Sequence, residues 1–108
     1  MAGAGEPEEL VVLRAEFAAE EGSFLLGLHE GEWDAEGFTR LERAMRAACT
    51  WCAGAALLER WLAEGFHLIP REVRAKAACL RRPPHDTAGL CDRLDDLSLC
   101  FFLGEPPG

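Results

Sequence analysis

Two cysteines three positions apart, Cys49 and Cys52, form the pattern in this chain that comes closest to chemistry. Thiols at this spacing lie on one side of a helix, where they could bind a metal ion or react in a redox cycle. A zinc site needs two further ligands. The other cysteines and histidines considered do not show the paired spacing of zinc-binding loops: Cys79, Cys91, Cys100, His67 and His85.

The pair is predicted to lie near the C-terminal end of a helix, where the helix dipole does not favour a thiolate. Cysteine also packs as a small apolar side chain, and this is the role that we expect for both residues. We therefore predict no metal ion and no cofactor. A thiol- or zinc-dependent sensor that uses Cys49 and Cys52 is the alternative from a different functional class.

The other catalytic patterns fail at a required position. His29 and Glu30 begin like the helix of a zinc protease, but Trp33 stands where the second histidine is needed. The sequence has neither a glycine-rich phosphate loop after a strand nor a nucleophile elbow, and the three histidines are scattered. We therefore predict that the protein is not an enzyme.

Charge is distributed unevenly along the chain. Ten of the nineteen acidic residues lie within residues 6–36, where Arg14 is the only basic residue. Residues 71–82 contain five basic residues and a single acid, Glu72. This segregation suggests a basic protein partner or a second copy of the chain. A net charge of −8 repels phosphates, so we expect no nucleic-acid partner.

Some of these acids are explained by helix starts, where negative charge complements the helix dipole. They are Glu8, Glu9, Asp34 and Glu36. The five acids that remain after Glu6 of the leader is set aside form the predicted partner-binding set, together with an aromatic anchor. Its members are Glu16, Glu20, Glu21, Glu30, Glu32 and Trp33. A second interpretation of Trp33 is a hydrophobic staple that packs against Phe38.

Apolar spacing predicts the elements that position these residues. A first helix is expected over residues 7–21, and residues 24–28 either continue it after a kink, form a separate turn or form a buried strand. Asp34 is a candidate N-cap of the next helix, which should stop near Cys52 with Gly54 as its left-handed cap.

A third helix is expected to begin near Ala55 and to carry a wide apolar stripe. The stripe contains Leu57, Leu58, Trp61, Leu62, Phe66 and either Leu68 or Ile69. Gly65 inside this helix suggests a close approach of another helix, and Pro70 is expected to open a fourth helix. Asp86 or Thr87 should cap the last helix and Gly104 should end it, although residues 97–103 could form a buried strand.

The sequence thus predicts an all-α fold: a compact single domain of four to five helices, orthogonal or bundle-like. Its expected limits are residues 7–104, with a flexible leader (1–6) and a tail (105–108). No apolar run is long enough to span a bilayer, and the first nine residues lack the features of a signal peptide, so we expect a cytoplasmic protein. Ten arginines against one lysine suggest a GC-rich bacterial genome.

Three segments resemble small uncharacterised bacterial proteins of about this length: Trp33–Met45, Leu58–Phe66 and Cys91–Asp96. Those proteins carry no assigned activity, so the resemblance implies no role for any residue. The functional hypothesis is a non-enzymatic, cytoplasmic protein-binding module with an acidic N-terminal face. It would act as an immunity or antitoxin-like protein, or as a regulatory adaptor, on a basic protein such as a toxin. A further alternative pairs the acidic and basic stretches with each other, either between copies in a homo-oligomer with complementary faces or within one chain.

Overall fold

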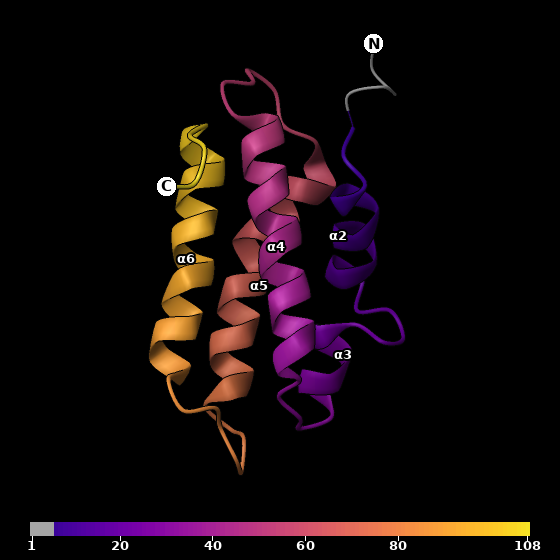
Figure 1. The fold of residues 1–108 in the computed structure, drawn as a ribbon, viewed down its shortest axis with the longest axis vertical. Helices are drawn as coiled ribbons and strands as arrows, with labels where there is room; N and C mark the ends of the chain where they lie inside the picture. Colours follow the sequence, from indigo (N-terminus) through magenta and orange to yellow (C-terminus); the bar gives the residue numbers. More distant parts are fainter. Residues whose placement is uncertain (1–5) are drawn as a thin grey trace.

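The computed structural model describes residues 6–108, and these residues contain helices but no strand. The helices are α2 (Glu9–Phe17), α3 (Phe24–His29), α4 (Ala35–Cys52), α5 (Arg60–Ala77) and α6 (Thr87–Leu103). The three long helices run side by side, and α2 and α3 lie on the side of α4 that faces away from α6 (Figure 1). The all-α prediction is confirmed, in its bundle-like form. Apart from Glu6, the expected leader lies outside the described residues.

Aromatic rings connect the helices through the core. The rings of Phe66 in α5 and Phe101 in α6 stack with centroids 4.1 Å apart. Phe17, the last residue of α2, meets Phe66 edge-on at 5.8 Å. The α2 helix therefore contacts α5 through an aromatic side chain, while its backbone packs mainly along α4.

The first helix ends earlier than predicted, at Phe17 and not at Glu21. Ala19 adopts a left-handed conformation with φ of 54°, and the amides of Ala19 and Glu20 donate to the carbonyls of Glu16 and Ala15. These two bonds form a Schellman motif, which closes a helix even though alanine here lacks the freedom of glycine. The chain then starts the separate helix α3, where the Ser23 side chain accepts a hydrogen bond from the Leu26 amide at 3.2 Å.

The boundaries of α4 agree with the prediction. The helix runs to Cys52, and Gly54 follows with φ of 78°. Asp34 occupies the N-cap position, but its side chain makes no capping hydrogen bond. Trp33 and Phe38 stack with ring centroids 5.2 Å apart, so the hydrophobic staple is formed.

Two predictions for α5 are wrong. The helix begins at Arg60 and not near Ala55, and Leu57 is 89% exposed in the preceding loop. Pro70 does not open a new helix, because α5 continues through it to Ala77. Ile69 and Pro70 are both buried in the bundle, and this packing outweighs the local preference of a proline to break a helix.

A close approach at Gly65 was predicted for another helix, and the structure shows one, but the group that approaches is the side chain of Phe17. A Cβ atom at this position would overlap the ring of Phe17. The glycine therefore provides the space into which the last side chain of α2 fits.

The last helix matches its predicted caps. The Asp86 side chain accepts a hydrogen bond from the Gly89 amide at 3.2 Å, and Gly104 ends α6 with φ of 74°. Residues 97–103 are helical, so the strand alternative is wrong. After α6, the Glu105 amide donates to the Cys100 carbonyl, and the tail turns back (Figure 1). None of the described helices is long and apolar enough to cross a membrane.

Candidate protein-interaction surface

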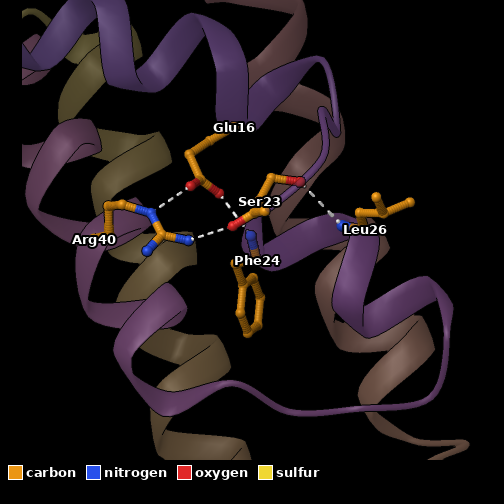
Figure 2. A network of polar contacts seen from close by, with 6 residues as sticks. Glu16, Ser23, Phe24, Leu26 and Arg40 are labelled. Atoms are coloured by element: carbon orange, nitrogen blue, oxygen red, sulfur yellow. Dashed lines mark hydrogen bonds and ion pairs between the residues drawn. The ribbon is translucent and has the colours of Figure 1, made fainter.

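Glu16 lies at the centre of a polar network that joins α2, α3 and α4 (Figure 2). One carboxylate oxygen accepts the amide of Phe24 at 2.9 Å, and the other accepts Arg40 Nε at 2.7 Å. Arg40 also donates to the carbonyl of Gly22 at 2.9 Å. Hydrogen bonding to Glu16 raises the pKa of the Arg40 guanidinium, which therefore stays charged. Glu16 is only 3% exposed, so the structure removes it from the accessible acidic surface.

Other packed helix pairs are also joined by ion pairs. Arg93 of α6 binds both carboxylate oxygens of Glu42 in α4, at 2.8 and 2.5 Å. Arg74 of α5 binds Asp92 and Asp95 of α6. His29 at the end of α3 contacts Glu72 of α5 at 2.9 Å. These acids connect helices to one another and leave the loop acids as the candidates for binding.

The acidic turn, defined as Glu20 and Glu21, follows α2. Both residues are exposed, and neither takes part in an ion pair within the described residues. The turn borders a hollow of about 230 Å³ that also contains Val12 and Arg40. Because Arg40 is already bound to Glu16, its charge is largely committed inside the protein. The carboxylates of the turn therefore face solvent beside an open hollow.

A larger hollow of about 520 Å³ continues from the first one along α2 and α4. The two share Val12 and Arg40, and together they form what we call the α2–α4 groove. Its lining includes Val11, Val12, Ala15 and Ala44 as apolar residues. Glu8 and Glu9 border the end opposite the acidic turn. The α4 wall carries two arginines: Arg40, which is bound to Glu16, and Arg43, which is exposed and makes no ion pair within the described residues. The groove thus has an apolar strip along α2, two arginines on the α4 wall and a pair of acids at each end.

The acidic loop, defined as residues 30–34, follows α3. Glu30 and Glu32 are exposed, whereas Trp33 is half-buried against Phe24 and Phe38, with ring centroids 4.9 and 5.2 Å away. Glu32, Trp33 and Asp34 line one depression together with Arg81 and Arg82, which lie in the connection between α5 and α6. The acidic loop therefore lies beside the basic segment of its own chain.

The two cysteines of the opening pattern lie inside the bundle. The Cys49 thiol is buried and donates a hydrogen bond to the Leu97 carbonyl at 3.3 Å. Burial raises the pKa of Cys49 to about 12, and burial also raises the pKa of Cys52. Thiolate, the form that attacks electrophiles and binds metals, is therefore scarce at Cys49 near neutral pH. Within residues 6–108, no three His, Cys, Asp or Glu side chains are placed to hold a metal ion.

One feature of the sequence indicates exposed apolar residues at the groove, but the prediction from charge did not use it. Residues 10–13 are four consecutive apolar residues, and successive helical positions are about 100° apart, so they cannot all face the core. Leu10 and Leu13 point inward, and Val11 and Val12 remain at the surface. The neighbourhood of Arg81 and Arg82 with the acidic loop agrees with the alternative in which the acidic and basic stretches of one chain lie beside each other. No protein-family model, curated protein or solved structure gives a significant match to the chain.

Proposed function

We propose that this protein is a non-enzymatic binding module whose acidic turn and neighbouring surface engage a basic protein partner. The partner would be a basic effector such as a toxin, which the module would neutralise, or a protein whose activity it regulates. Complementary charge accelerates such encounters and selects the correct partner, because like charges repel the wrong ones. The site residues of the proposal are Glu20, Glu21, Glu30, Glu32 and Trp33.

One observation carries this proposal: the accessible acids of the turn lack an internal cation, whereas the acids between helices have one. Glu16 and Glu42 are nearly buried and paired with arginines. Glu20 and Glu21 are exposed at the rim of a groove whose α2 wall is apolar. A surface of this kind combines an apolar centre with a charged rim, which is the usual anatomy of a protein interface.

Self-association through opposite charges receives less support. The most basic connection of the chain, with Arg81 and Arg82, already borders the acidic loop of the same molecule. An acidic face of a second copy would therefore have to compete for Arg81 and Arg82 with the acidic loop of the same chain, which is beside them at every protein concentration. For this reason we place a different, basic protein first.

The proposal is tested with the basic proteins encoded by the genes on either side of this one. Each is purified and titrated against the full chain by calorimetry at 50 and 500 mM NaCl. We expect one tight complex that weakens with salt, because exposed charges more than about 10 Å apart are screened at 0.1 M ionic strength. The double variant Glu20→Lys/Glu21→Lys should weaken it about tenfold or more, since like charges would then meet.

The matched control is Glu64→Lys/Glu105→Lys, which changes the net charge equally at exposed acids outside the proposed site. It should leave affinity nearly unchanged at physiological salt. Failure of every basic candidate to bind, or a complex equally weakened by both double variants, would refute the proposed site.

A further inference from the structure

The middle of the α2–α4 groove exposes two adjacent branched apolar side chains. Val11 is 68% exposed and Val12 is 36% exposed, although Leu10 and Leu13 on either side of them in the same helix are buried. Covering these valines with apolar atoms of a partner would remove hydrocarbon surface from water, which favours association. An acidic surface that served solubility alone would not need them.

Charged side chains at the two ends of the groove define what can lie in it. Glu8 and Glu9 precede or begin α2, and the acidic turn, Glu20 and Glu21, follows it. The nine residues of α2 rise about 13 Å at 1.5 Å each, so the two acidic pairs lie roughly 15 Å apart. A ligand complementary to this pattern carries positive charge near both ends, apolar side chains against the valines, and no basic side chain opposite Arg43 on the α4 wall.

The walls of the groove favour a helix over an extended strand. Both walls are helices, and a third helix can pack beside them at an axial distance of about 8–10 Å with its side chains in their grooves. An added strand would need an open sheet edge for its backbone hydrogen bonds, and the described residues contain no strand. On a ligand helix, about 11 residues cover 16 Å, which matches the separation of the acidic pairs.

We propose that the α2–α4 groove binds an amphipathic helix of the basic partner. Apolar residues at i, i+3 or i+4, and i+7 of that helix cover Val11 and Val12. A lysine or arginine near each end, about three turns apart, meets Glu8 and Glu9 at one end and the acidic turn at the other. This inference rests on the proposed function and adds which secondary structure of the partner is recognised, and where.

The direct test uses two synthetic 18-residue peptides of identical composition, titrated against the full chain by fluorescence anisotropy. In the first peptide, leucines form one helical stripe and lysine pairs stand near both ends. In the second, the same leucines are distributed around the helix. The first peptide should bind at least tenfold more tightly. Equal binding, or no binding of the first peptide, would overturn the inference.

The valines are tested with Val11→Ser/Val12→Ser, and Leu68→Ser is the control at an exposed apolar residue of α5 that is 54% exposed. The double variant should lower affinity for the striped peptide at least tenfold, and the control should change it less than twofold. If the double variant is not helical by circular dichroism, Val11→Ser is measured in its place and should lower affinity several-fold. Unchanged affinity in a folded valine variant contradicts the inference.

The same variants separate this inference from the proposed function. Loss of partner binding on reversal of Glu20 and Glu21, with normal binding of the valine variant, would reject the groove and retain the acidic module. Normal binding by both variants would reject both proposals. The last experiment is sedimentation of the chain without a ligand. If the chain is a dimer that dissociates in the valine variant, the groove is filled by a second copy of the chain, and the proposal of a partner helix is wrong.

Discussion

The acidic turn and the acidic loop flank the same short helix, α3, yet they differ in what surrounds them. Arg40, which lines the hollow beside the turn, is held by Glu16 and by the Gly22 carbonyl. The loop shares a depression with Arg81 and Arg82 of the same chain. A single run of negative charge in the sequence has therefore become two surfaces, one beside an arginine that is bound to Glu16 and one beside two arginines that make no ion pair within the described residues. Charge along a sequence locates binding surfaces only after the fold has assigned internal partners.

The difference between the acidic turn and the acidic loop depends most on Glu16, because Glu16 binds Arg40, the arginine that would otherwise neutralise the turn. Glu16→Ala should destabilise the fold by about 2–3 kcal/mol, since the buried Phe24 amide loses its acceptor and Arg40 its partner. Urea unfolding followed by circular dichroism measures this change.

Glu16→Gln keeps an acceptor for the amide and should cost about half as much. Glu20→Ala is the solvent-exposed counterpart and should change stability by less than about 0.5 kcal/mol. If Glu20→Ala lowers stability as much as Glu16→Ala, the turn is part of the structural network. The contrast between a structural Glu16 and a solvent-facing turn would then be wrong.

The ring of Phe17, three residues before the acidic turn, packs against Gly65. Gly65→Ala should destabilise by about 1 kcal/mol, because overlap with the Phe17 ring costs about 1–3 kcal/mol and the gain in helix propensity returns about 1 kcal/mol. Displacement of Phe17, which precedes the turn by three residues, should also weaken partner binding. Thermal unfolding and the calorimetric titration measure the two effects.

Gly27→Ala in α3 is the matched control, since a methyl group there would meet no atom within 4 Å. It should stabilise by up to about 1 kcal/mol through helix propensity alone. If Gly65→Ala stabilises the protein as Gly27→Ala does, the Phe17 ring does not occupy the space beside Gly65. The contact proposed to hold the turn in place would then be incorrect.

The smallest expected effect concerns the acidic loop and the two arginines beside it, Arg81 and Arg82. Arg81→Gln/Arg82→Gln removes the cations beside the acidic loop and should strengthen binding of a basic partner about two- to fivefold at low salt, as the loop comes to resemble the turn. Stability should fall by no more than about 0.5 kcal/mol, because exposed charge interactions are weak. Arg71→Gln/Lys76→Gln is the control of equal charge; an identical gain there would indicate a general charge effect.

Local signals in the sequence predicted the features that depend on a few neighbouring residues. The cap at Asp86, the left-handed end at Gly104 and the stacking of Trp33 on Phe38 are of this kind. The failures involve distant residues. Packing of Ile69 and Pro70 in the bundle carries α5 through the proline.

The same distinction explains the candidate site. The exposed positions of Glu20 and Glu32 agree with a surface prediction, but the burial of Glu16 depends on Arg40, 24 residues away. The groove could not be predicted because its exposed valines, Val11 and Val12, can be identified only once Leu10 and Leu13 are known to point into the core. The part that escaped prediction is therefore the part built by contacts between helices.

One turn of α6 has a consequence for the handedness of the whole bundle. Asp92 and Asp95 face Arg74 of α5, while Arg93 between them faces Glu42 of α4. In the mirror-image arrangement, with α4 and α5 exchanged around α6, Arg93 would meet Arg74 and the two aspartates would meet Glu42. Apolar packing alone distinguishes such mirror topologies poorly, and like charges placed opposite one another penalise the wrong one. Three charged residues on one helical turn thus help to specify whether the bundle winds to the left or to the right.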